Sequence, residues 1–168
     1  MSDRERQFLE LVRENRGRLR RIARVYAAGR AEREDLYQEM LLQVWRSLPS
    51  FEGASSAATW LYRVALNTAL DHDRTRERRR EARIDDDHPL HDRGFRRPDR
   101  AFEERERLER LRRAIDELDE GDRALMLLHL EGASYEEMSE VLGITENYVG
   151  VKLHRIRKEL SAMLEEEA

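Results

Sequence analysis

Residues 134–158, SYEEMSEVLGITENYVGVKLHRIRK, decide the fold of this chain. Ser134 and Glu137 have the spacing of a capping box, which predicts the start of a short helix. Gly143 is the residue type that ends such a helix, and Thr145 is suited to cap a second, longer one. A short helix, a tight turn and a longer helix are typical of a helix-turn-helix, whose second helix enters the major groove of DNA.

The predicted second helix combines an apolar stripe with a basic surface. Val149 and Leu153 repeat at helical spacing and are expected to pack against the first helix. Between them lie cations that are available to phosphates or base edges. Basic residues toward a helix C-terminus also commonly form a merely solvated surface, so that alternative stays open. The four cations are Lys152, Arg155, Arg157 and Lys158.

The distribution of charge along the chain favours the DNA-binding interpretation. The 168 residues include 32 basic and 36 acidic side chains, and 30 of the basic ones are Arg. Residues 1–80 carry 17 basic and 12 acidic side chains, whereas residues 81–168 carry 15 and 24. The second half is therefore acidic overall, and the predicted second helix concentrates positive charge within it.

The pattern of apolar residues predicts an all-α fold. Helical spacing is found over residues 6–27, 33–48 and 60–74, with a loop of small and polar residues at 50–59. A further helical segment begins at residue 108 and runs to a break at Gly132, ahead of the helix-turn-helix. With 40% charged residues the chain is too polar for one thick core. We therefore expect two small helical domains, residues 1–80 and 108–168, joined by a charged linker over residues 81–107.

Composition disfavours several other classes of protein. The chain has no Cys, which excludes disulfides and Cys-ligated zinc or iron–sulfur sites. No phosphate-binding loop, nucleophile elbow or cluster of carboxylates and His indicates an enzyme, and no cofactor is expected. His88 and His91 lack a third ligand, so we expect no metal. No apolar run is long enough for a signal peptide or a membrane span, which predicts a cytoplasmic protein without membrane insertion.

Two segments of the first half are candidate contact surfaces. Residues 60–80 combine Trp60, Asn67 and a basic tail, a mixture suited to unpaired bases, although Trp is also a typical core residue. Residues 33–48 have a polar face that either receives a protein partner or is simply solvated. That face consists of Asp35, Gln38, Glu39 and Gln43.

Three segments of the chain, taken in order, resemble the extracytoplasmic-function class of bacterial RNA polymerase sigma factors. They are EDLYQEMLLQVWRSLPSFEG, TWLYRVALNTALDHDR and, after the charged linker, LDEGDRALMLLHLEGASYEEMSEVLGITENYVGVKLHRIRKEL. The resemblance covers nearly the whole chain. It implies a region-two domain and a region-four domain in a non-enzymatic protein that binds core RNA polymerase, directs it to promoters and helps to open the DNA.

The resemblance also implies partners and residue roles. The expected partners are the β′ clamp and the β flap of core polymerase, promoter DNA and an anti-sigma factor. The residues implied in polymerase docking are Asp35, Gln38, Glu39, Gln43 and Trp45. Those implied in recognition of the minus-ten element are Asn67, Trp60, Arg63 and Arg74. Those implied in recognition of the minus-thirty-five element are Tyr148, Lys152, His154, Arg155, Arg157 and Lys158.

The second helix departs from the commonest family pattern. Many relatives read roughly Thr-Val-Lys-Ser-Arg where this chain has YVGVK at residues 148–152, which removes one cation and one hydroxyl. The promoter sequence is therefore not predicted. Two other classes stay open, namely a free-standing helix-turn-helix regulator and a helical interaction protein with an accidental basic helix. A free regulator normally dimerises on a palindrome, and no dimerisation helix is evident.

Overall fold

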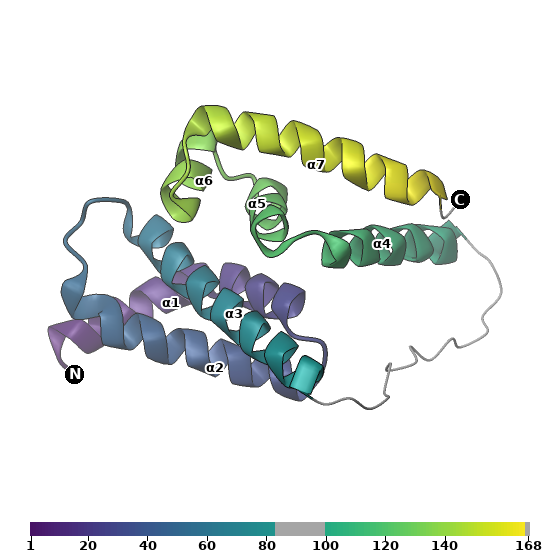
Figure 1. The fold of residues 1–168 in the computed structure, drawn as a ribbon. Helices are drawn as coiled ribbons and strands as arrows, with labels where there is room; N and C mark the ends of the chain where they lie inside the picture. The colour runs from purple at the N-terminus through teal and green to yellow at the C-terminus, as the bar shows by residue number, and fades with distance from the viewer. Residues whose placement is uncertain (83–99, 167–168) are drawn as a thin grey trace.

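The computed structural model describes residues 1–82 and 100–166. Within these ranges the chain forms helices and no strand, which confirms the all-α prediction. None of these helices is long and apolar enough to cross a membrane. His88 and His91 lie outside the described residues. The helices are α1 (Asp3–Tyr26), α2 (Arg30–Ser47), a short 3-10 turn (Leu48–Ser50), α3 (Ala57–Ala82), α4 (Arg100–Glu117), α5 (Glu120–Leu130), α6 (Tyr135–Leu142) and α7 (Glu146–Glu166), as Figure 1 shows.

The first three helices form a bundle in which each packs against the other two. The helix α3 continues to Ala82, well beyond the expected end at residue 74, because the Arg- and Glu-rich residues that follow are good helix formers and no Gly or Pro interrupts them. The core of the bundle is mainly apolar, and its buried polar residues are Asn15, Thr59, Thr68 and Asp73. Its most deeply buried residues include Leu19, Ile22, Leu36, Met40, Val44, Leu61 and Leu66.

The second unit contains α4 to α7, with α7 packed along α4, α5 and α6. The sequence pattern predicts helical structure from residue 108 to a break at Gly132, and the structure divides this stretch between two helices. The helix α4 begins at Arg100, and a new helix starts after Asp119, whose side chain accepts a 2.8 Å hydrogen bond from the Asp122 N–H. Asp119 is therefore the N-cap of α5.

The predicted helix-turn-helix is present. Ser134 and Glu137 form both hydrogen bonds of the capping box, at 3.1 and 2.8 Å. Gly143 ends α6 in the left-handed conformation with φ of 67°, which only a residue without a side chain adopts easily. Thr145 accepts a 3.2 Å hydrogen bond from the Tyr148 N–H at the start of α7. These local signals, rather than distant contacts, set the geometry of the motif.

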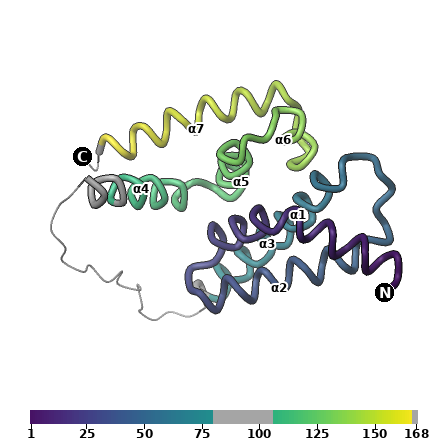
Figure 2. Tube along the Cα trace, turned by 180° about the vertical axis from the view of Figure 1, so that it is seen from behind, coloured from purple at the N-terminus to yellow at the C-terminus, as the bar shows by residue number. Residues whose placement is uncertain are grey.

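The two units pack directly against each other. Figures 1 and 2 show α5 and α6 facing the bundle while α7 lies on the outer side of the second unit. The helix α6 packs on α3, and the buried apolar residues of both units form one continuous cluster. Seven consecutive residues of α5, Asp122 to Leu128, are buried, which shows that this helix is covered on all sides.

Candidate polymerase and nucleic-acid interfaces

One side of α2 presents an unburied surface on the bundle. Four of the residues that the sequence assigns to polymerase docking are exposed there. Between them lies Leu42, an apolar side chain that is 47% exposed. Its spacing of four from Gln38 and three from Glu39 puts it on the same side of the helix. We call Asp35, Gln38, Glu39, Leu42 and Gln43 the α2 surface.

Trp45, the fifth residue assigned to docking, packs within the bundle. Its ring contacts the Phe8 ring edge-on at a centroid distance of 5.3 Å, and the Arg4 guanidinium lies 4.0 Å from its centroid. The side chain is only half-buried, so part of its edge adjoins solvent. Trp45 therefore fixes the N-terminal end of α1 against α2.

The residues assigned to the minus-ten element lie along one side of α3. Trp60, Arg63, Asn67 and Arg74 are spaced by three, four and seven residues, which aligns them in a single stripe. Asn67 is exposed. Trp60 is half-buried and stacks on Phe51 at a centroid distance of 5.0 Å, so it packs against the loop that precedes α3. We call these four residues the α3 stripe.

The second unit covers part of the α3 stripe. Arg63 donates a hydrogen bond to the Glu140 carbonyl at the end of α6. Arg74 pairs with Glu120 at the start of α5, through contacts of 2.9 and 2.7 Å. This hydrogen bond raises the pKa of Arg74 above its ordinary value. In the arrangement seen here, two of the four stripe residues are therefore engaged by the other unit.

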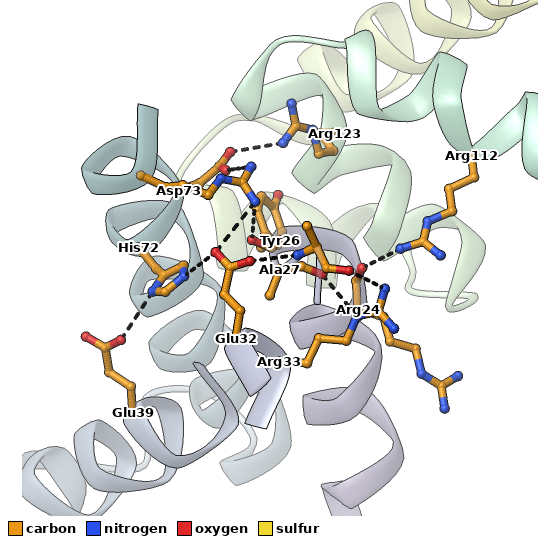
Figure 3. A network of polar contacts seen from close by, with 12 residues as sticks. Arg24, Tyr26, Ala27, Glu32, Arg33, Glu39, His72, Asp73, Arg112 and Arg123 are labelled. Carbon is orange, nitrogen blue, oxygen red and sulfur yellow. Dashed lines mark hydrogen bonds and ion pairs between the residues drawn. The ribbon is translucent and has the colours of Figure 1, made fainter. Parts of the chain in front are cut away.

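A buried ion pair also joins the two units. The Asp73 carboxylate accepts a 2.9 Å hydrogen bond from Arg123 in α5, and the side chains are 4% and 10% exposed (Figure 3). Arg76 contacts the second Asp73 oxygen at 2.5 Å. The Arg123 guanidinium lies 5.7 Å from the centroid of the Tyr26 ring in α1. The contact therefore draws on α1, α3 and α5 together.

Glu32, at the start of α2, collects polar partners beside this ion pair. It accepts a 2.9 Å hydrogen bond from the Ala28 N–H, and lies 3.2 Å from His72 and 3.8 Å from Arg76. Burial raises the pKa of the Glu32 carboxyl, but the Ala28 hydrogen bond, the His72 contact and the Arg76 charge outweigh it and leave the pKa below its ordinary value. His72 also approaches Glu39 at 3.6 Å and so connects the α2 surface to α3, as Figure 3 shows.

The residues assigned to the minus-thirty-five element do not share one environment. Lys152 is only 16% exposed and pairs with the Asp122 carboxylate, whose side chain is 3% exposed. Arg155 lies 3.3 Å from the same carboxylate but remains 63% exposed. Arg157 contacts the His129 ring at 2.8 Å on the other flank of α7. Tyr148, His154 and Lys158 are exposed.

Two exposed residues of α7 escaped the sequence-based assignment. Asn147 is exposed and Val151 is 59% exposed. Both lie on the side opposite the buried stripe of Val149, Leu153 and Ile156. Neither residue is among those that the resemblance implies, although their helical positions alone place them on the outer side. With Tyr135, Glu146, Gly150 and His154 they line a shallow groove of about 620 Å³.

A second groove, of about 540 Å³, lies where α4 and α5 meet the end of α1. Its floor is apolar, and two of its residues, Leu108 and Leu130, are 60% and 62% exposed. Arg21, Arg24 and Arg112 lie at its edges. Among the described residues there is no group of three or more His, Cys, Asp or Glu that would hold a metal ion.

These two helical units define a class of protein. Residues 11–79 match the family model of sigma-70 region 2, and residues 108–160 match that of sigma-70 region 4. The chain belongs to the sigma-70 family of RNA polymerase sigma factors. Within that family it is an extracytoplasmic-function sigma factor.

Curated relatives carry names of the same kind. The chain is 32% identical over 155 residues to the ECF RNA polymerase sigma factor SigE of Mycolicibacterium smegmatis, an alignment that covers 90% of this chain and 59% of SigE. It is 33% identical over 144 residues to the RNA polymerase sigma-H factor of Pseudomonas aeruginosa, covering 80% of this chain and 74% of that protein. The chain thus spans less than two thirds of SigE.

Solved structures share the arrangement of helices. CnrH in complex with the cytosolic domain of CnrY superimposes with a TM-score of 0.70 at 25% identity, covering 98% of this chain and 91% of CnrH. The sigma factor RpoE of Bartonella quintana, in complex with the anti-sigma factor NepR, superimposes with a TM-score of 0.67 at 22% identity and 98% coverage of both chains. The second likeness concerns the fold alone.

Proposed function

We propose that this chain binds bacterial core RNA polymerase, directs it to specific promoters and helps to open the DNA there. The observation that carries the proposal is the separation of three unlike surfaces over the two family regions. The α2 surface is polar with one exposed Leu, the α3 stripe suits unpaired bases, and the outer side of α7 suits a major groove. A sigma factor requires surfaces both for the polymerase and for the two promoter elements.

Each surface has a proposed partner. The α2 surface docks on the clamp of the β′ subunit, the α3 stripe captures a base of the minus-ten element, and α7 binds the minus-thirty-five element. Capture of a flipped base costs a few kcal/mol of unstacking, which contacts to the single strand offset. The protein itself catalyses no reaction, and it works in the cytoplasm where polymerase and genome are.

The apolar groove between α1, α4 and α5 is the proposed place for the β flap. Leu108 and Leu130 lie exposed on it, and exposed apolar patches of this kind mark protein contacts. An anti-sigma factor is a further proposed partner, as the resemblance to the family implies. The structurally similar CnrH is found with a bound protein, the cytosolic domain of CnrY. To keep the protein inactive, such a partner has to compete with core polymerase.

Run-off transcription tests the proposal. Purified core polymerase is combined with the full chain and a pooled library of promoter fragments from the same genome. Specific transcripts that appear only with the protein are the expected result, and aligned upstream sequences then supply both promoter elements. Failure to bind core polymerase would instead favour a free-standing helix-turn-helix regulator.

Variants of the α2 surface test the proposed contact with core polymerase most directly. Leu42→Asp places a charge in the centre of the proposed contact and should lower affinity for core polymerase at least tenfold, which corresponds to about 1.4 kcal/mol. Gln38→Ala combined with Glu39→Ala should weaken binding as well. Leu9→Asp is the matched control, because Leu9 is 54% exposed on α1, away from the α2 surface. Equal affinity of the Leu42 and Leu9 variants would remove α2 from the interface.

A further inference from the structure

Most of the side chains on the outer side of α7 are not cations. A helix that enters the major groove presents to the bases the side chains opposite its packed face. On α7 the packed face is formed by Val149, Leu153 and Ile156, all fully buried. Residues at helical spacing on the opposite side are Asn147, Val151, His154 and Lys158, and all four are exposed.

Lys152 is directed away from that side. Its ammonium pairs with the Asp122 carboxylate of α5, and the two side chains are 16% and 3% exposed. If Lys152 turned toward DNA it would leave a buried carboxylate without its closest partner, which is unfavourable. Arg155 contacts the same carboxylate only at 3.3 Å and is 63% exposed, so it does not replace Lys152. Lys152 therefore couples α7 to α5.

Gly150 shapes the surface next to Asn147 and Val151. A side chain at position 150 would begin 3.4 Å from the Tyr135 ring of α6, so the ring lies close against the bare backbone of α7. The result is the shallow groove of about 620 Å³ that Asn147 and Val151 line together with Tyr135. The groove therefore offers a base edge the Asn147 amide and the two Val151 methyl groups, with Glu146 and His154 also in its lining.

We propose that Asn147 and Val151 read base pairs of the minus-thirty-five element, and that Lys152 is a positioning residue that does not read bases. The inference rests on the proposed function and adds which residues recognise the bases of this element. An Asn side chain makes paired hydrogen bonds to the adenine N6 and N7 atoms, and apolar groups contact the thymine methyl. The element therefore contains an adenine opposite Asn147 and a thymine beside Val151. His154, Arg155 and Lys158 contact flanking bases or phosphates.

The experiment uses holoenzyme made from core polymerase and the full chain. A promoter that the wild-type protein transcribes receives a randomised minus-thirty-five element, and the transcribed templates are sequenced. Asn147→Ala should lower the preference for adenine at one position about tenfold, and Val151→Ala should lower the preference for thymine at a nearby position several-fold. Ser161→Ala, on the exposed part of α7 beyond the motif, is the control and should reproduce the wild-type preferences.

Lys152 is tested together with its partner. Asp122→Asn combined with Lys152→Met removes both charges, so no buried carboxylate is left alone. This double variant should lower transcription without changing any preferred base. A change of preferred base in it, or wild-type preferences in both the Asn147 and the Val151 variants, would overturn the inference and leave the proposed function intact. A wild-type holoenzyme that selects no minus-thirty-five sequence would overturn the proposed function, and the inference with it.

Discussion

Gly150 illustrates how a single residue combines a local cost with a tertiary contact. Glycine inside a helix is about 1 kcal/mol less favourable than alanine, because it loses more backbone freedom on folding. In α7 this cost accompanies the close approach of the Tyr135 ring, which would lie 3.4 Å from an added Cβ. Tyr135 is 43% exposed, so its ring has room to move outward.

Gly150→Ala should therefore stabilise the protein by about 0.5–1 kcal/mol, since the gain in helix propensity exceeds the cost of a small movement of an exposed ring. Chemical denaturation of the full chain followed by circular dichroism measures the free energy of unfolding. A lower stability than wild type would show that the Tyr135 ring is held in place by more than its contact with α7.

Glu32 predicts a dependence of stability on pH. The pKa of this carboxyl is lower in the folded protein than its ordinary value of 4.5, so the folded state favours the charged form. Its contribution to stability is therefore complete above that value and is lost as the pH falls through the lowered pKa. Denaturation of wild type and Glu32→Gln over a range of pH should give a difference that is largest near neutrality and shrinks in acid. A difference independent of pH would contradict this assignment.

At the scale of the element, α6 is the helix that depends most on its cap. It has eight residues, and an isolated helix of this length is not stable in water. Both hydrogen bonds of the capping box are present, at 3.1 and 2.8 Å. The capping box therefore adds local stabilisation to the burial of Met138 and Val141 in this short helix.

Ser134→Ala should lower the free energy of unfolding by about 1 kcal/mol. The Glu137 N–H loses its hydrogen-bond acceptor, and only one of the two hydrogen bonds of the capping box can still form. Thermal and chemical denaturation measure the change. Ser161→Ala is the matched control, since Ser161 is exposed on α7 and makes no cap. Equal losses in the two variants would mean that the box contributes nothing measurable.

The separation along the chain between interacting residues explains which elements the sequence predicts well. The helix-turn-helix was predictable because Ser134, Gly143 and Thr145 act through bonds to residues close in the chain. The fate of Lys152 was not, because its partner Asp122 lies 30 residues earlier on another helix. The position of a cation on its helix does not reveal whether a carboxylate on another helix forms an ion pair with it. Exposed Leu42 was missed as well, since the face predicted for a protein partner over residues 33–48 consisted of polar side chains alone.

At the scale of the whole molecule, the two units close over part of the α3 stripe. The exposed pair of Arg74 with Glu120 contributes little to stability, as surface ion pairs usually do. The buried pair of Asp73 with Arg123 is of a different order, because breaking such a pair by removing one partner costs about 3–5 kcal/mol. The closed arrangement therefore depends on Asp73 more than on Arg74.

Asp73→Lys should separate the two units, because it replaces attraction to Arg123 and Arg76 with repulsion in a buried place. Small-angle X-ray scattering of the free protein should show a larger radius of gyration, and binding to single-stranded minus-ten DNA should become tighter as Arg63 and Arg74 are released. Glu77→Lys makes the same charge change at an exposed position of α3 and is the control. Identical scattering of the two variants would show that Asp73 does not hold the units together.

The packing of the units could not be predicted from the chain. Composition indicated two small domains with a charged linker, and each unit does have its own helices. What composition did not indicate is that the buried apolar residues of the two units are continuous. The apolar run of residues 124–128 is consistent with a core helix of either unit, and only the fold shows that both units cover it.

The burial of α5 on every side affects whether one helical unit can be exchanged for that of a relative during evolution. A chimaera that joins this second unit to the first unit of a relative would inherit an α5 surface shaped for a different bundle. Under the proposed function, α7 of such a chimaera would still read the same upstream element, because the outer side of α7 is built within one unit. The packing of the two units over the α3 stripe would be lost, because it requires matching surfaces on both units. Choice of the upstream element would thus be carried by the second unit alone, whereas the packing over the α3 stripe depends on both units.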